Sequence, residues 1–210
     1  MTLAIAAGAE LSYAAAMSPD PASRLHPAAA SALVVIDMQE RLIPALADLD
    51  RVLRSIGLVI EAARKLGVPT VVTEHCPAQI GPTVAVLADQ LAHAVRVEKT
   101  HFSAVHEPAF APVMQAWRDR TVILCGAEAH VCVAQTAIGL ADAGHRVGVV
   151  VDAVGARHPE DKAIALDRLR QAGIVPYSVE MLITEWLGDA ADPLFKPLLK
   201  SIKARHELRL

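Results

Sequence analysis

TVILCGAEAHVCVAQTAIGLADAGHRVGVVVD, residues 121–152, is the stretch that decides the fold. It begins with an apolar, β-branched run (121–126) and ends with a second such run (146–152). Between them, residues from about 130 to 143 have a helical pattern that Gly144 closes. A strand, a helix and a strand in this order form a βαβ unit with parallel strands. The stretch therefore predicts an α/β protein.

Other apolar runs along the chain have a similar length and character. They are SALVVID (31–37), PTVVTE (69–74), AVRVEK (94–99) and IVPYS (174–178). Helical patterns lie between these runs, one ending near Gly67 and another opening at Pro159. The sequence thus predicts a doubly wound parallel sheet of about six strands with helices on both faces.

The expected order of the strands decides which residues meet. In the common order 3-2-1-4-5-6, the order reverses between the first and fourth strands, and ligands bind there at the carboxyl ends of the strands. Asp37 follows the first strand and Cys132 follows the fourth, so the two residues would face each other across this crevice. Lys99 ends the third strand and would open onto the same edge.

The composition narrows the class of protein. Of 210 residues, 53% are hydrophobic but only 3% are aromatic, which suits an aliphatic core around a buried sheet. The formal net charge is -3 and basic residues form no run. We therefore expect a small-molecule substrate, with neither nucleic acid nor a membrane surface as a partner.

The cysteines indicate the compartment. Cys76, Cys125 and Cys132 are odd in number and have no C-x-x-C spacing, so they predict neither a disulfide framework nor a zinc site. This usage favours a reducing, cytoplasmic location. Cys125 lies in an apolar strand and is expected to be inert. Cys76 lies in a loop near the expected pocket, where it could line the pocket or be an oxidisable thiol without a role in catalysis.

The N-terminal residues need a separate interpretation. Residues 1–18 are Ala-rich and end in an A-x-A-like stretch, but they have no basic residue before the apolar part, and Glu10 interrupts it. These features argue against a secretory signal. We interpret residues 1–30 as an extension without full order, or as a misassigned start with Met17 as the initiator, and residues 31–210 as the domain.

Asp37, Lys99 and Cys132 together suggest nucleophilic catalysis. Cys132 lies near the start of a helix, where free N–H groups and the helix dipole favour a thiolate, and an ammonium at Lys99 would lower the thiol pKa further. Asp37 can take the thiol proton and deliver it to a leaving amine. Each residue also has an ordinary alternative. Cys132 could be a buried hydrophobic thiol, Asp37 a cap at the end of a strand, and Lys99 a solvated surface charge. Their expected convergence favours the catalytic interpretation.

Three blocks carry a family resemblance. ALVVIDMQERL, VEKTHFSA and CGAEAHVCV resemble the signature blocks of the isochorismatase-like cysteine hydrolases, and TEHCPAQIGPTV with LGDAADPLFKPLLKSIK resembles the subgroup of isochorismatase domain-containing proteins. The resemblance runs from about residue 31 to about 200. It implies a Rossmann-like three-layer α/β/α fold, and a catalytic triad that maps onto Asp37, Lys99 and Cys132.

The resemblance also implies details that the residues alone do not give. It implies a cis peptide bond between Ala127 and Glu128, which would turn backbone N–H groups inward. The amides of Glu128 and Cys132 would then form an oxyanion hole. It further implies an oligomeric protein. We expect no cofactor, because the nicotinamidase branch of the family has an Asp-x-His metal block after the second strand, where this sequence has TEHCP.

Other residues near the expected site have two interpretations each. Gln39, His75, Phe102 and His130 are candidates for the substrate pocket. Gln39 could instead brace the loop of Asp37, Phe102 could be core, and His130 could make a structural hydrogen bond. Metal binding at His75 and its neighbour Glu74 is disfavoured, because adjacent residues on a strand point to opposite sides.

Two other classes of function compete with hydrolysis. A nucleotide- or cofactor-binding module would need a glycine-rich turn after the first strand, whereas that strand continues into DMQERLIP. A vestigial site in an oligomeric scaffold is the second alternative. Among reactions, a cysteine nucleophile favours amide hydrolysis through a thioester, with ester or isochorismate-type hydrolysis as alternatives. The sequence leaves the acyl group open.

Overall fold

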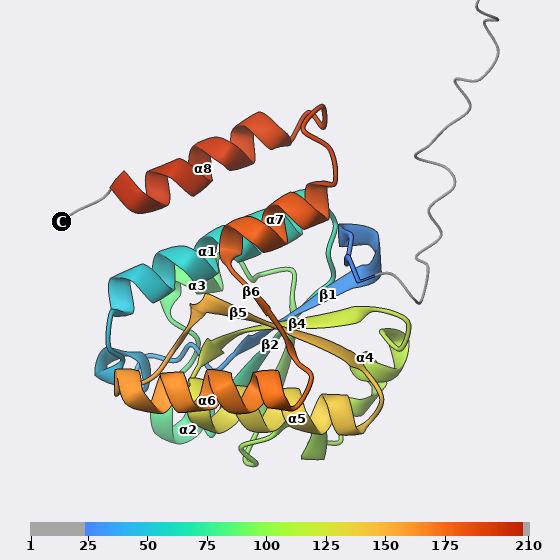
Figure 1. Cartoon of the computed structure of the whole chain (residues 1–210). Helices are drawn as coiled ribbons and strands as arrows, with labels where there is room; N and C mark the ends of the chain where they lie inside the picture. The colour runs from blue at the N-terminus through green and yellow to red at the C-terminus, as the bar shows by residue number, and fades with distance from the viewer. Residues whose placement is uncertain (1–23, 208–210) are drawn as a thin grey trace, which may run out of the picture.

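The computed structural model describes residues 24–207 of the chain. Its centre is a sheet of six parallel strands in the order β3-β2-β1-β4-β5-β6 (Figure 1). The strands are β1 (Ser31–Ile36), β2 (Thr70–His75), β3 (Val95–Lys99), β4 (Thr121–Ala127), β5 (Arg146–Gly155) and β6 (Val175–Tyr177). The predicted number, direction and order of the strands are confirmed.

Helices follow the strands along the chain. The α-helices are α1 (Leu49–Lys65), α2 (Pro77–Ile80), α3 (Ala85–Ala88), α4 (Ala111–Ala116), α5 (Ala134–Asp142), α6 (Pro159–Gln171), α7 (Val179–Leu187) and α8 (Phe195–Glu207). Short 3-10 turns are η2 (Ala28–Ala30), η3 (Ile43–Ala45) and η4 (Ala104–His106), and η5 (Ala129–Val133) is a π-helical turn. Within residues 24–207, no helix has the length and apolar character needed to cross a membrane.

The helices form one layer on each face of the sheet. α1, α7 and α8 lie on one side of the sheet, and α5 and α6 lie on the other (Figure 1). Alternate residues of β1 face the two layers: Leu33 and Val35 belong to the core under α1, whereas Val34 and Ile36 belong to the core that includes Leu140 of α5. The predicted three-layer α/β/α fold is confirmed.

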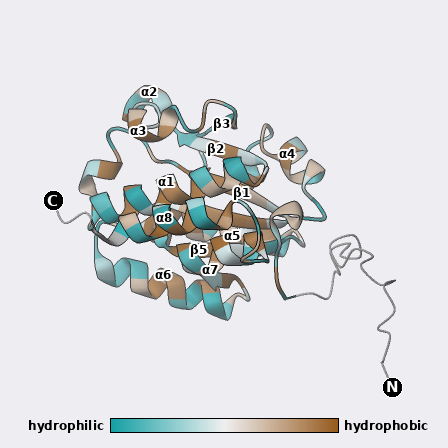
Figure 2. Ribbon diagram, turned by 90° about the horizontal axis from the view of Figure 1, so that it is seen from above, coloured by the Kyte–Doolittle hydropathy of each residue, from teal (hydrophilic) through white to brown (hydrophobic). Residues whose placement is uncertain are grey.

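The sequence of α1 explains its position. Val52 and Ile56 repeat at helical spacing on its buried side, and burying such a side chain stabilises a fold by about 1.5–3 kcal/mol. Arg64 and Lys65 lie in the last turn, where positive charge complements the helix dipole. Gly67, with φ 70°, then reverses the chain into β2. Figure 2 shows the hydrophilic and hydrophobic bands along the outer helices that such one-sided burial produces.

The packed domain begins before the predicted boundary at residue 31. His26, Ala28 and Ala30 are buried, and the backbone N–H of His26 donates a hydrogen bond to the Glu185 carboxylate. The His26 ring contacts the hydroxyl of Tyr177. Residues 26–30 therefore belong to the domain, because they cap the sheet beside β6 and α7. Residues 1–23, with the rest of the predicted extension and the alternative start at residue 17, lie outside the described residues.

Candidate active site

Asp37, Lys99 and Cys132 come together at the carboxyl edge of the sheet. Asp37 follows β1, Lys99 ends β3, and Cys132 lies in η5 directly after β4. Lys99 Nζ lies 2.7 Å from Asp37 Oδ2 and 3.4 Å from Cys132 Sγ. The exposed fractions are 0% for Asp37, 2% for Lys99 and 6% for Cys132. The convergence expected from the strand order is thus observed, in a buried cluster of one carboxylate, one ammonium and one thiol.

The backbone places Asp37 beside β4. Gly126, with φ 121°, lies so close to β1 that a Cβ atom added to it would be 2.1 Å from the carbonyl oxygen of Ile36. Only glycine fits this approach. Asp37 itself has a φ of 46°, and its Oδ1 accepts a hydrogen bond of 2.6 Å from Thr73 Oγ1 on β2. The carboxylate is therefore fixed by both neighbouring strands.

The turn that holds Cys132 has an unusual backbone. A cis peptide bond joins Ala127 to Glu128, at the position that the family resemblance implied. The π-helical turn η5 then leads directly into α5, so the predicted helix from about residue 130 is confirmed with a wider first turn. Such turns occur frequently at functional sites. The buried Glu128 carboxylate pairs with Arg157 Nε at 2.9 Å, which fixes the start of the turn.

The state of the thiol differs from the expectation of a lowered pKa. Burial and the neighbouring Asp37 carboxylate raise the pKa of Cys132 to about 12, and the Lys99 ammonium acts in the opposite direction. Burial disfavours the charged thiolate more than one ammonium favours it. In the free protein, Cys132 therefore carries its proton, and Asp37 is the adjacent group that can accept it.

Gln39 supports the loop after β2 and does not line an open pocket. It has an exposed fraction of 0%. Its Nε2 donates to the carbonyl oxygens of His75 (3.0 Å) and Gly81 (2.6 Å), and its Oε1 accepts from the backbone N–H of His75 (2.7 Å). Of its two interpretations, full burial contradicts pocket lining and agrees with bracing.

Glu74 also supports this loop. Its Oε1 accepts hydrogen bonds of 2.7 Å from both the backbone N–H and the hydroxyl of Thr83, and it forms an ion pair with Arg96 of β3. The roles of Thr83 and Arg96 were missed in the sequence, although Thr83 lies in the TEHCPAQIGPTV block. Among residues 24–207, no group of three or more His, Cys, Asp or Glu side chains could hold a metal ion.

The remaining pocket candidates lie on two sides of the cluster. His75 and Phe102 are stacked, with ring centroids 5.5 Å apart and an interplanar angle of 21°, and Phe102 is 52% exposed. Both residues lie beside Lys99, whose Nζ is 3.4 Å from His75 Nδ1 and 3.3 Å from the carbonyl oxygen of Phe102. His130 instead turns toward α6, with Nε2 at 3.7 Å from Asp161 Oδ2.

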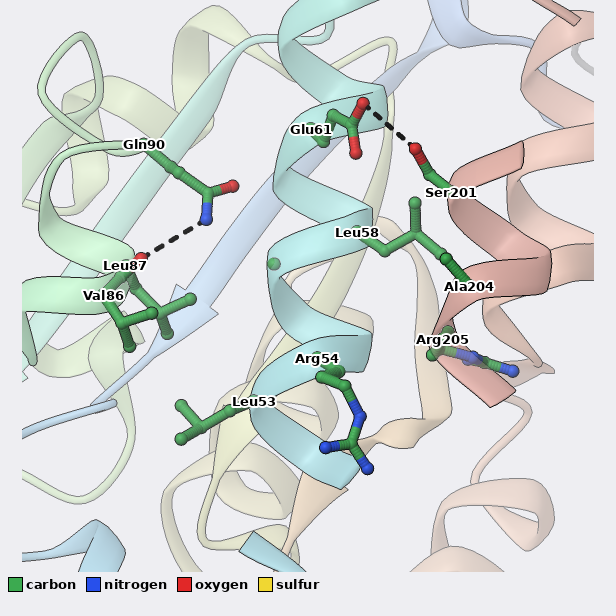
Figure 3. Close-up of a pocket in the computed structure, with 11 residues that line it drawn as sticks. Leu53, Arg54, Leu58, Glu61, Val86, Leu87, Gln90, Ser201, Ala204 and Arg205 are labelled. Carbon is green, nitrogen blue, oxygen red and sulfur yellow. Dashed lines mark hydrogen bonds between the residues drawn. The ribbon is translucent and has the colours of Figure 1, made fainter. Parts of the chain in front are cut away.

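Two pockets differ in their relation to this cluster. One, of about 510 Å³, is lined by Lys99 together with Cys76, Pro77, Ala78, Gln79, Glu98, Thr100 and Glu107. The side chain of Lys99 is fully buried, and neither Asp37 nor Cys132 lines this pocket. The other, of about 360 Å³, lies over α1 between α3 and α8, where Leu53, Leu58 and Val86 provide apolar walls (Figure 3). None of the residues that line this second pocket belongs to the Asp37–Lys99–Cys132 cluster.

Comparison with known proteins agrees with the fold. The isochorismatase domain profile matches residues 31–181. Isochorismatase domain-containing protein 2 of Bos taurus is 40% identical over 174 residues, which cover 82% of this chain and 83% of that protein. The structure of the MAR1 ribonuclease from Caenorhabditis elegans has a TM-score of 0.79 and 36% identity, covering 86% of this chain and 93% of that chain. YcaC from Pseudomonas aeruginosa, solved with covalent acrylamide, has a TM-score of 0.80 at 22% identity, covering 87% and 94% of the two chains.

The fold and the buried cluster define a class of α/β proteins with a thiol at the carboxyl edge of a parallel sheet. Within this class, the chain belongs to the isochorismatase family, whose members are isochorismatase-like hydrolases. The family resemblance of the three sequence blocks is thereby confirmed.

Proposed function

We propose that this protein is a cysteine hydrolase that cleaves an amide-type C–N bond of a small molecule. The observation that carries the proposal is the position of Lys99 Nζ between the Asp37 carboxylate, at 2.7 Å, and the Cys132 thiol, at 3.4 Å. A nucleophile, a base and a fixed positive charge are the groups that covalent hydrolysis of a carbonyl compound requires.

The first half of the reaction forms a thioester. Cys132 Sγ attacks the carbonyl carbon while its proton passes to Asp37, and the carbonyl oxygen becomes an oxyanion. When the C–N bond breaks, Asp37 returns that proton to the leaving nitrogen, which departs as ammonia or an amine. Lys99 stabilises the negative charge that moves between its two neighbours.

The second half of the reaction releases the acid. Asp37 takes a proton from a water molecule, whose oxygen attacks the thioester carbonyl carbon. The C–S bond then breaks, and the sulfur recovers its proton from Asp37. The sum is one amide and one water converted to one carboxylic acid and one amine.

The oxyanion is held by the backbone N–H groups of Glu128 and Cys132 in this proposal. The ion pair of Glu128 with Arg157 supports it, because a fixed turn presents its amides without reorganisation. Loss of one such donor typically removes about 2.7–4 kcal/mol of transition-state stabilisation.

The substrate is a small molecule in this proposal. Phe102, which is exposed and stacks on His75 beside Lys99, offers a wall for an acyl group of modest size. The ribonuclease name of the Caenorhabditis elegans neighbour makes RNA the comparison substrate. The net charge of -3 and the absence of a basic run in the sequence support a small amide over RNA.

We also propose a homo-oligomer in the cytoplasm without a cofactor. Light scattering after size-exclusion chromatography tests the oligomeric state.

The test is a substrate panel with matched cysteine variants. Wild type, Cys132→Ala and Cys125→Ala are compared on small primary amides, N-carbamoyl compounds, esters, isochorismate and RNA, with folding checked by circular dichroism. Cys125 is a buried thiol on the opposite side of the sheet from Cys132, so it controls for loss of a core sulfur.

The outcomes separate the alternatives. We expect amide hydrolysis and an acyl adduct on Cys132 by intact-mass spectrometry in wild type and Cys125→Ala, and neither in Cys132→Ala. Turnover restricted to esters or isochorismate would replace the amide assignment. Amide hydrolysis that survives in Cys132→Ala would overturn the mechanism, and a folded wild type without any turnover or adduct would support the scaffold alternative.

A further inference from the structure

We propose that His75 is a positioning residue: its ring accepts a hydrogen bond from the Lys99 ammonium and must stay uncharged to hold that ammonium between Asp37 and Cys132. The inference rests on the proposed function, since it assigns a residue that acts through Lys99. It also makes the reactivity of Cys132 sensitive to acid.

The backbone brings His75 and Lys99 together. The two residues are direct partners in the register of the parallel strands β2 and β3. The N–H of Cys76, the next residue, donates a hydrogen bond of 2.8 Å to the carbonyl oxygen of Lys99. Gln39 bonds both the N–H and the carbonyl oxygen of His75. The His75 backbone is therefore fixed relative to Lys99 from two directions.

The His75 ring is held as firmly as its backbone. Its Nδ1 lies 3.4 Å from Lys99 Nζ, its Nε2 lies 3.7 Å from the sulfur of Cys76, and one face stacks on Phe102. When Nδ1 is unprotonated, it accepts from the ammonium and Nε2–H points to the sulfur. A protonated ring would instead direct an N–H of its own toward the ammonium.

Several charged groups face His75 from the elements around it. They are the ammonium of Lys99 on β3, the carboxylate of Asp37 after β1 and the carboxylate of Glu107 after η4. The uncharged backbone carbonyl of His101 also interacts with the ring. Burial and then Lys99 lower the pKa of His75, and the other groups raise it without reversing the direction. The ring is therefore neutral at pH 7, as an acceptor for the ammonium must be.

Protonation of His75 would place a second positive charge beside Lys99. Like charges at this distance repel, and Lys99 would lose its fixed position relative to Cys132. Lys99 loses this position as the pH falls through the pKa that His75 has in the folded protein, which lies below the ordinary value of about 6.5. Gln in place of His keeps an acceptor but cannot become charged, whereas Phe keeps a stacking ring without an acceptor.

The experiment measures alkylation of Cys132 by iodoacetamide between pH 4.5 and 8.5, with each cysteine resolved by peptide mass spectrometry. Wild type, His75→Gln and His75→Phe are compared, and each rate is divided by that of His75→Gln at the same pH. Dividing the two alkylation rates cancels the pH dependence that Cys132 itself and the other groups at the site contribute to both proteins.

We expect the ratio for wild type to be constant above pH 7 and to fall about tenfold for each pH unit below the pKa of His75, the slope of a single-proton titration. His75→Phe should be about three- to tenfold slower than His75→Gln at every pH, with no acid step. The protonation of the His75 ring is followed by NMR over the same pH range. A wild-type ratio that stays flat while the ring becomes protonated overturns the role of His75 and leaves the proposed function intact. Amide hydrolysis that survives in Cys132→Ala is the distinct result that overturns the function.

Discussion

The backbone of Gly126 lies against that of Ile36 so closely that no side chain fits between them. This approach joins the ends of β1 and β4, from which the carboxylate and the thiol of the site extend. A Cβ atom at residue 126 would meet the carbonyl oxygen of Ile36 at 2.1 Å, and the φ of 121° is strained for any other residue. The close approach gives a direct prediction for stability.

Gly126→Ala is expected to destabilise the fold by about 2–4 kcal/mol, because the two strands must separate and the backbone must strain. Urea denaturation measures the change. Gly144→Ala is the matched control, since Gly144 also has a positive φ, of 87°, but no atom within 4 Å of an added Cβ. Gly144→Ala should lower the free energy of unfolding by about 1 kcal/mol. Equal losses in both variants would show that contact with Ile36 contributes nothing.

Asp37→Asn is expected to separate thiol reactivity from turnover. The Asp37 carboxylate raises the pKa of Cys132 and the Lys99 ammonium lowers it, so removing the carboxylate lowers the thiol pKa from about 12. Alkylation of Cys132 at pH 7.5 should become about tenfold faster or more, because more thiolate is present. Amide turnover should fall by at least about 100-fold, because no group accepts and returns the proton.

The control for this charge change is Asp119→Asn. Asp119 is exposed and lies just before β4, at the opposite edge of the sheet from Cys132. Asp119→Asn should leave both the alkylation rate of Cys132 and the rate of amide turnover unchanged. Slower alkylation in Asp37→Asn would mean that the carboxylate already deprotonates the thiol in the free protein.

Gln39→Leu tests the brace of the loop after β2. The substitution keeps the side-chain size but removes three partly buried hydrogen bonds between Gln39 and the backbone of His75 and Gly81. Unsatisfied buried groups cost about 1–3 kcal/mol each, so we expect a loss of about 3 kcal/mol or more in urea denaturation. Hydrogen exchange should accelerate in residues 75–83. Arg41→Ala, which removes one exposed bond to the Gln79 carbonyl, should have little effect on either measurement.

Stability should fall in mild acid. Burial lowers the pKa of His26, His75 and His145 below the ordinary value of about 6.5. A histidine whose pKa is lower in the folded protein binds fewer protons there than in the unfolded chain, so its contribution is complete above pH 6.5 and is lost as pH falls. We expect the melting temperature to decrease between pH 7 and 5, and to decrease less in His26→Gln. An identical decrease in that variant would remove His26 from the explanation.

The sequence was sufficient for the architecture. The alternation of β-branched runs with helical patterns predicted the strands, and the common order of doubly wound sheets then brought Asp37, Lys99 and Cys132 to one edge. These arguments succeed for two reasons. Burial of both faces of a parallel sheet requires apolar runs that can be recognised in the sequence, and the carboxyl ends of parallel strands lie at one edge of the sheet regardless of the loop conformations.

The details of the site depend on distances that a pattern does not contain. The thiol pKa was expected to fall because a helix start and an ammonium favour a thiolate, but burial and the adjacent carboxylate outweigh both. Gln39 was a pocket candidate and Glu74 a disfavoured metal ligand, and only the contacts of the folded loop identify them as its supports. Thr83 and Arg96 complete that support. Thr83 lies in the TEHCPAQIGPTV block, but the block does not show which side chain Thr83 contacts, and no local pattern marks Arg96.

The ammonium of the site comes from the outermost strand of the sheet. β3 has one strand neighbour, whereas the carboxylate and the thiol follow the two central strands β1 and β4. The place of Lys99 in the sheet therefore depends on a single strand pairing, that of β3 with β2. The ion pair of Glu74 with Arg96 joins these two strands, so it secures the strand that carries the ammonium as well as the loop after β2.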